Sequence, residues 1–151
     1  MTQDATDPLT LVHSLVAHIE DHAIVTLDSE GRILTWNDGA ERITGYPAGE
    51  RIGRHYAEYA AASLPDAPEP HWALNVASAE GRFEHHGWRA RKDGVRYWCE
   101  SVLTALFDPQ RNLLGYGEVS RDVTARKWQE ERFRVAVESA PNALVMINRE
   151  G

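Results

Sequence analysis

The chain has 151 residues, 42% of them hydrophobic and 26% charged, and its formal net charge is −7. This length accommodates one domain with flanking segments. No apolar run approaches the roughly 20 residues of a membrane span, the N-terminus does not resemble a signal peptide, and an acidic chain is a poor partner for phosphate backbones. The single cysteine, Cys99, excludes an internal disulfide and is typical of a reducing compartment. We therefore expect a cytoplasmic localisation, no nucleic-acid partner and no membrane contact.

Residues 1–19 predict a polar tail followed by an amphipathic helix. Asp7 is a suitable cap for this helix and Pro8 a suitable first residue. The apolar residues at helical spacing are Leu9, Val12, Leu15, Val16 and Ile19. Because so short a helix is unstable by itself, we expect its apolar stripe to dock on another surface.

Residues 20–124 predict one antiparallel α+β domain. Two short β-prone runs, 23–28 and 32–36, flank a turn that contains glycine. A short helix capped by Asn37 or Asp38 follows, and further helical stretches are expected up to residue 79. Three β-prone runs complete the domain, at 83–90, 95–107 and 113–122. Strands that precede and follow a group of helices in this way indicate helices packed on an antiparallel sheet.

The last part of the chain predicts a linker and a repeat. Residues 125–140 contain neither glycine nor proline and read as one charged helix. The segment "NALVMINREG" at 142–151 repeats the pattern of "HAIVTLDSEG" at 22–31. We therefore expect residues 141–151 to be the truncated start of a second domain of the same kind, with a strand at 142–151, in a fragment of a tandem array.

Three motifs carry a resemblance to a known family. They are "GRILTWNDGAERITGYPAGERIGRH", "RARKDGVRYW" and "GYGEVSRDVTARK", and together with the repeat they resemble the PAS domains (sensory boxes) of bacterial multi-PAS sensor histidine kinases. The resemblance implies a five-stranded antiparallel sheet with short helices over one face, plus an N-terminal helix and a C-terminal linker helix. It also implies a pocket between sheet and helices that holds a small molecule, a flavin, a haem or only side chains.

The residues expected in this pocket come from several elements. Alternation in "VRYWCESVLTAL" does not by itself decide which face is inward, since both faces carry apolar residues. Similarity to flavin-binding PAS domains completes the set of candidates: Val25, Leu27, Trp36, Tyr56, Arg89, Tyr97, Cys99, Ser101, Leu103 and Ser120. A buried guanidinium at Arg89 needs a partner, which is a ligand anion, an internal carboxylate such as Glu118, or water.

Cofactor chemistry can be weighed from single residues. The flavin-binding light-oxygen-voltage (LOV) subclass has a reactive cysteine in a G-R-N-C-type stretch, where this chain has "GRHY" with Tyr56 in its place. Stacking of a non-covalent flavin on Trp36 and Tyr56 remains open, as does haem ligation by His71. We expect no visible chromophore, and either no ligand or a small organic one.

Metal and catalytic sites are not expected. His85 and His86 are adjacent in a strand, so their rings point to opposite faces and cannot share one ion. Hydrolase, metalloprotease, dithiol and phosphate-loop motifs are absent from the sequence. We therefore expect this chain not to be an enzyme, although the parent protein would be a histidine kinase.

Output and partners follow from the C-terminal motif and the remaining sheet face. Asp122 and Thr124 match the D-[IV]-T signature of PAS output; we expect their oxygens to accept N–H groups of the linker helix and Asp122 to pair with Arg121 or Arg126. The opposite face of the long strand carries Trp98, Val102 and Leu106, which need a cover from the N-terminal helix of the same chain or of a partner. We expect a homodimer that relays a signal to downstream PAS and kinase domains; the alternative is a ligand-free dimerisation spacer.

Overall fold

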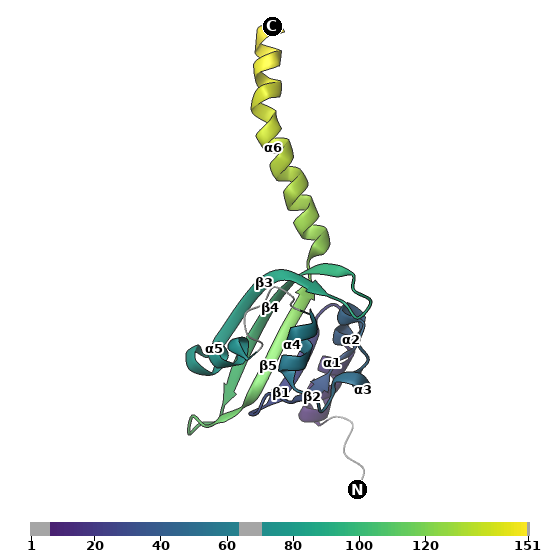
Figure 1. The fold of residues 1–151 in the computed structure, drawn as a ribbon, viewed down its shortest axis with the longest axis vertical. Coiled ribbons are helices and arrows are strands. Elements are labelled where there is room, and N and C mark those ends of the chain that lie inside the picture. Colours follow the sequence, from purple (N-terminus) through teal and green to yellow (C-terminus); the bar gives the residue numbers. More distant parts are fainter. Residues whose placement is uncertain (1–6, 64–70, 151) are drawn as a thin grey trace.

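Five strands form one antiparallel sheet in this computed structural model, which describes residues 7–63 and 71–150. The strand order across the sheet is β2-β1-β5-β4-β3 (Figure 1). The strands are β1 (Ala23–Asp28), β2 (Ile33–Trp36), β3 (Arg82–Ala90), β4 (Arg96–Phe107) and β5 (Leu113–Asp122). The expected α+β class and five-stranded sheet are confirmed.

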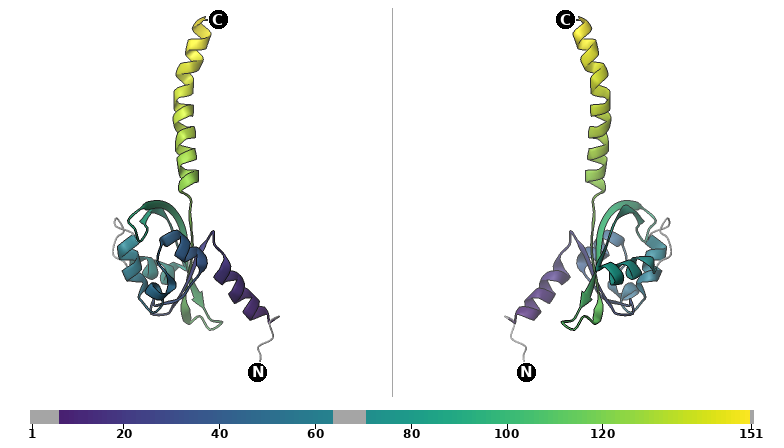
Figure 2. Two further views of the ribbon diagram at one scale, coloured as in Figure 1. Left: turned by 90° about the vertical axis from the view of Figure 1, so that its right-hand side faces the viewer. Right: turned by 90° about the vertical axis from the view of Figure 1, so that its left-hand side faces the viewer.

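Six helices accompany the sheet within the described residues: α1 (Pro8–His18), α2 (Asp38–Thr44), α3 (Ala48–Arg51), α4 (Tyr56–Ser63), α5 (Trp72–Glu80) and α6 (Thr124–Glu150). Helices α2 to α5 cover one face of the sheet, which we call the inner face, and α1 lies on the other side, the outer face (Figure 2). The long helix α6 leaves the domain at the end of β5. In the part of the chain that the structure describes, no helix combines the length and apolar character needed to cross a bilayer.

Asn37 holds the start of the domain together through its buried side-chain amide. Its Oδ1 accepts hydrogen bonds from the backbone N–H of Ile24 (2.8 Å) and of Ala40 (2.9 Å), so it caps α2 and bonds to β1 at once. Its Nδ2 donates to the carbonyl oxygens of Val16, Ile19 and His22, each at 3.0 Å. One amide therefore bonds to backbone groups of α1, β1 and α2 and joins these three elements.

The burial of alternate residues shows which face of β4 is inward. Its inward residues are buried against the helices, and they are Tyr97, Cys99, Ser101, Leu103 and Ala105. The residues between them, Trp98, Glu100 and Val102, are half-buried on the outer face. The inward residues of β4 therefore include those that the resemblance to PAS domains placed in the pocket, which are Tyr97, Cys99, Ser101 and Leu103.

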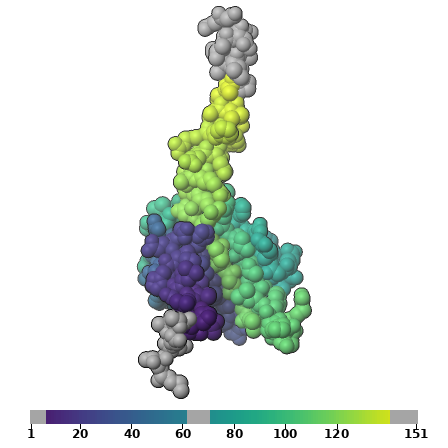
Figure 3. Space-filling view, turned by 180° about the vertical axis from the view of Figure 1, so that it is seen from behind, coloured from purple at the N-terminus to yellow at the C-terminus, as the bar shows by residue number. Residues whose placement is uncertain are grey.

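Helix α1 does not cover the outer face of β4, so the expectation that this helix covers it within the same chain is wrong. Its cap is as expected, with Asp7 accepting from Thr10 N–H at 3.2 Å. The helix lies beside the β1–β2 hairpin, where α1 residues and Leu34 and Ile52 line a groove of about 520 Å³. Asn37, which follows β2, anchors the end of α1 there. The strands β1 and β5 lie between β2 and β4. Figure 3 shows the outer face with α1 over only one side of it.

Helix α6 continues to Glu150, so the strand expected at 142–151 is not formed at 142–150. A helix satisfies its backbone groups locally, whereas a strand must pair with another strand. The assignment of residues 141–151 to the start of a second domain stays a prediction, and Gly151 lies outside the described residues.

We predict that Gly39→Ala destabilises the domain whereas Gly49→Ala does not. Each glycine is the second residue of a short helix, α2 or α3. A Cβ at Gly39 would lie 1.9 Å from the carbonyl oxygen of His22, whereas one at Gly49 would meet nothing within 4 Å. Relief of this clash should lower the free energy of unfolding by about 1–3 kcal/mol, and the Gly49 variant should be neutral or slightly stabilised. Urea denaturation measures both, and equal midpoints would contradict the prediction.

Candidate functional site

A buried ion pair lies between the sheet and the helices. Arg89 of β3 is 1% exposed and Glu118 of β5 is 2% exposed, and Arg89 Nη1 lies 3.2 Å from Glu118 Oε1. The strand β4 separates β3 from β5, so the pair reaches across it on the inner face. Of the three partners considered for Arg89, the structure contains the internal carboxylate.

Three hydroxyl groups form hydrogen bonds with this pair, and the buried Nε of Arg89 has no hydrogen-bond partner among the described residues. Tyr56 donates to Glu118 Oε2 at 2.5 Å. Arg89 donates from Nη1 to the Tyr59 hydroxyl at 3.3 Å and from Nη2 to Ser101 Oγ at 2.8 Å. The network therefore joins α4 to β3, β4 and β5. Tyr59 was not among the sequence candidates, although it lies three residues after Tyr56 and hence on the same helix face.

The protonation states in this network follow from burial and from the neighbouring charges. Burial alone would lower the pKa of Arg89, but Glu118 and the nearby tyrosines raise it well above the usual value, so the guanidinium stays charged. Burial and the Glu118 carboxylate raise the pKa of Tyr56, which keeps its proton for the bond to Glu118. Burial raises the pKa of the Cys99 thiol to about 11, so it is neutral near pH 7 and a weak nucleophile.

The remaining candidate positions belong to the same core. Val25, Leu27, Trp36, Tyr97 and Leu103 are members of one cluster of buried apolar side chains. Within it the Trp36 ring packs edge-on against Tyr59 at 5.5 Å, and its Nε1 donates to the Tyr46 carbonyl at 2.9 Å. Ser120 is buried and pairs in register with Ser101. All ten candidates therefore lie on the inner side; their roles in ligand binding stay predictions.

The histidines are dispersed. His71 is exposed at the N-terminal end of α5, with its ring 5.2 Å from that of His55. His85 lies on the inner face, where its ring folds over Gly87, and His86 is exposed on the outer face, so the two point apart as expected. Across residues 7–63 and 71–140, no group of three or more His, Cys, Asp or Glu side chains has an arrangement that could hold a metal ion.

The junction between β5 and α6 is built around Asp122. Its Oδ1 accepts from the backbone N–H and the hydroxyl of Thr124, at 2.9 and 2.5 Å, which bonds it to the first residue of α6 as expected. Thr124 differs from the expectation, because its Oγ1 accepts from Trp98 N–H of β4 at 2.8 Å.

The cation beside Asp122 is Arg91, not Arg121 or Arg126. Arg91 Nη2 lies 2.5 Å from Asp122 Oδ2, and its Nη1 donates to the Ile43 carbonyl near the end of α2. Arg121 is adjacent to Asp122 in β5, so its side chain points to the outer face, where it pairs with Glu100 at 3.1 Å. Arg126 of α6 pairs with the same Glu100. Arg91 is in the β3–β4 turn, far from Asp122 in sequence, and only the folded sheet brings them together.

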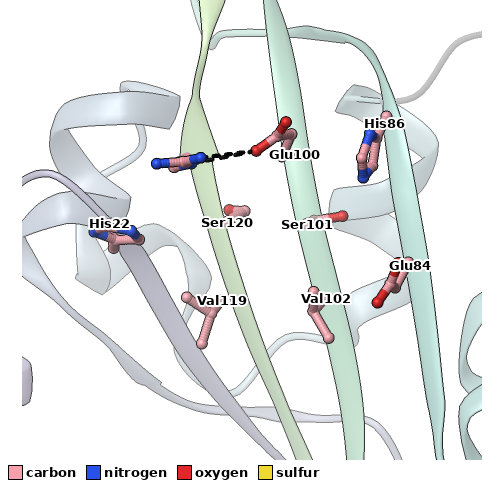
Figure 4. A pocket seen from close by; sticks show the side chains of 9 residues that line it. His22, Glu84, His86, Glu100, Ser101, Val102, Val119 and Ser120 are labelled. Carbon is pink, nitrogen blue, oxygen red and sulfur yellow. Dashed lines mark hydrogen bonds and ion pairs between the residues drawn. The ribbon is translucent and has the colours of Figure 1, made fainter.

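The outer face carries a polar hollow of about 300 Å³ near this junction (Figure 4). Acidic and basic side chains from four segments surround it: His22, Glu84, His86, Glu100 and Arg121. Val102 and Val119 form its apolar part. The hollow lies on the opposite side of the sheet from the ion pair of Arg89 and Glu118.

We predict that Glu118→Gln strongly destabilises the domain. The substitution keeps the shape of the side chain but leaves Arg89 buried and unpaired, which typically costs about 3–5 kcal/mol. The matched control is Glu50→Gln, since Glu50 pairs with Lys92 at the surface (2.7 Å, each side chain 48% exposed), and such pairs contribute about 0–1 kcal/mol. Free energies of unfolding from urea titrations compare the variants, and similar losses in both would contradict a structural role for the buried pair.

Comparison with known proteins agrees with this architecture. The chain is 39% identical over 126 residues to two-component system protein A of Emericella nidulans, a match that covers 83% of this chain and 18% of that protein. It therefore spans about a fifth of the length of this curated relative.

Solved structures and a family model give the same fold. A PAS domain from Colwellia psychrerythraea matches with a TM-score of 0.67 at 24% identity, covering 79% of this chain and 99% of that one. The PAS domain of an HTR-like protein from Haloarcula marismortui matches with a TM-score of 0.56 at 25% identity, covering 74% and 91%. The family model described as "PAS fold" matches residues 17–127. This chain belongs to the PAS family.

Proposed function

We propose that this PAS domain is the sensory module of a larger cytoplasmic signalling protein, a sensor histidine kinase. It senses a signal in or near its inner face and relays it through α6 to downstream PAS and kinase domains. The relative from Emericella nidulans, named a two-component system protein, supports this context. We also propose that this signalling protein is bacterial, as expected from the resemblance of its motifs to the PAS domains of bacterial sensor histidine kinases.

The junction at Asp122 carries this proposal. Through Arg91, Asp122 is connected to the end of α2 on the helical layer, and through Thr124 it is connected to α6. Thr124 in turn bonds to β4. A rearrangement of the helical layer or of the sheet would therefore change the hydrogen bonds at the first residue of α6, and two such arrangements of differing stability are sufficient for a relay.

Homodimerisation is part of the proposal. On α1, Leu9 is 80% and Leu15 64% exposed, and on the outer face Leu106 and Val119 are each 44% exposed. Apolar surface of this kind is typical of protein–protein contacts. A second copy of the chain would cover both surfaces and place two α6 helices together.

A second candidate function is a ligand-free dimerisation spacer. The observation that favours it is the internal pairing of Arg89 with Glu118, which gives the guanidinium its counter-charge without a ligand anion. In a spacer, the inner face would serve only as a core closed by its own side chains.

Absorption spectroscopy and mass spectrometry of the purified protein distinguish between these two functions. We expect no visible absorption band, because Tyr56 replaces the flavin-reactive cysteine and His71 is an exposed residue at a helix start. Mass spectrometry of the denatured extract should show a small organic molecule if the module senses a ligand in its core. An extract without one favours the spacer. A Soret band or flavin fluorescence after denaturation would contradict the expectation about cofactors.

We predict that Asp122→Ala combined with Thr124→Ala uncouples α6 while leaving the domain folded. Loss of a helix cap typically costs about 0.5–2 kcal/mol, a small part of the stability of a domain. The full-length protein should show altered basal kinase output and a weaker response to its signal, with thermal unfolding of the 151-residue chain near that of the parent.

The matched control for the junction is Asp108→Ala. Asp108 accepts Asn112 N–H at 2.8 Å in the turn at the other end of β5, so its loss removes a similar bond far from α6. A double variant at Asp122 and Thr124 that signals like the parent would show that the junction only caps the helix.

A further inference from the structure

Helix α6 contacts the domain through side chains of its first five residues. Arg126 pairs with Glu100 on the outer face, the Lys127 ammonium lies 3.8 Å from the centroid of the Trp98 ring, and the Trp128 ring lies 6.1 Å from that of Trp88. Beyond Trp128 the helix stands away from the sheet (Figure 1), and its ion pair between Arg134 and Glu131 is internal. We call the six residues at the contact the docking cluster: Trp88, Trp98, Glu100, Arg126, Lys127 and Trp128.

On the sheet, the docking cluster depends mainly on two residues of β4, Trp98 and Glu100. Trp98 provides the ring beneath Lys127, packs edge-on against Trp88 at 5.2 Å, and bonds through its backbone to Val123 and Thr124. Glu100 holds Arg126 of α6 and Arg121 of β5 with one carboxylate. Residues 98 and 100 therefore determine how the first turns of α6 lie on the sheet.

The residues that alternate with these two face the core. Tyr97, Cys99 and Ser101 are buried on the inner face, and Ser101 Oγ accepts the bond from Arg89 Nη2. The stretch 97–101 is hydrogen-bonded to β3 along its length, and residues 99–101 are also paired with β5. It therefore moves as part of the sheet, with its inner side bonded to the ion pair and its outer side bonded to α6.

We propose that residues 97–101 of β4 couple the buried Arg89–Glu118 network to the docking of α6 through the docking cluster. A change in the network that displaces Ser101 would displace Trp98 and Glu100 on the other side of the same strand. The sheet side of the docking cluster would then lose contact with its α6 side, which is Arg126, Lys127 and Trp128. The first turns of α6 would fray, because a helix end without tertiary packing is marginal in water. This inference rests on the proposed relay through α6, and specifies a route besides Asp122.

Amide hydrogen exchange of the 151-residue chain tests the docking step. Trp128→Ala and Glu100→Gln should each raise the exchange rates of amides 128–134 roughly two- to tenfold, as expected for the loss of an aromatic or charged contact. Amides of β4 and β5 should keep their rates. The matched control is Phe133→Ala, which removes an aromatic side chain that is 71% exposed on α6. Unchanged exchange in both cluster variants would overturn the proposal.

The coupling step is tested from the inner face. Ser101→Ala should raise the exchange of amides 128–134 in the parent chain, and should have no further effect once Trp128→Ala and Glu100→Gln are both present. Ser120→Ala is the control, since it removes a buried hydroxyl at the paired position in β5. No effect of Ser101→Ala, or the same effect with and without the docking cluster, would overturn the coupling.

Failure of this inference is distinguishable from failure of the proposed function. One outcome is that the docking variants abolish the effect of Ser101→Ala on amide exchange while the same variants in the full-length protein still respond to the signal. In that case the relay stands and this route through β4 is wrong. If output never responds although the exchange coupling is present, the relay itself is wrong.

Discussion

The buried charge of Arg89 constrains everything around it. A guanidinium without water must be paired, and breaking such a pair leaves an uncompensated charge in the core. Glu118 supplies the opposite charge from β5, and the hydroxyls of Tyr59 and Ser101 accept further bonds from the two Nη atoms, whereas the buried Nε of Arg89 has no hydrogen-bond partner in the part of the chain that the structure describes. These partners come from one helix and two strands, so the position of α4 relative to the sheet is fixed by polar bonds as well as by apolar packing. Such a network favours one arrangement of its parts.

This network also bears on what the inner face can sense. Because Glu118 already neutralises Arg89, an anionic ligand would have to displace an internal carboxylate, whereas a neutral one would have to displace packed side chains such as Trp36 and Leu103. Either event would alter the bonds of Ser101 or of α4. Under the proposed function, a small organic ligand or a physical signal would therefore act by competing with the protein's own contacts.

Two connections lead from the domain to α6, and they use opposite faces of the sheet. Arg91 and Asp122 connect the helical layer to the first residue of α6. Trp98 and Glu100 bind its next residues on the outer face. Since both connections meet within one helical turn, the direction of α6 depends on the sheet and on the helices together. In the proposed dimer, a small rotation at the base of this long helix would become a large displacement at its end.

Local patterns in the sequence were sufficient to predict the strands, the short helices, a helix cap at Asn37 or Asp38 and the family motifs, because hydrophobic period, turn residues and caps act over a few positions. The sequence also narrowed the partner of Arg89 to three kinds, with Glu118 named. It did not determine Tyr59, Arg91 or the docking cluster, whose contacts join residues far apart in the chain. It predicted a strand at 142–151 from local similarity, whereas the structure is helical through residue 150, since a strand exists only beside another strand. The folded structure was needed to identify the inward face of β4, the cation that pairs with Asp122 and the position of α1. Burial and charge pairing depend on neighbours that only the folded sheet brings together.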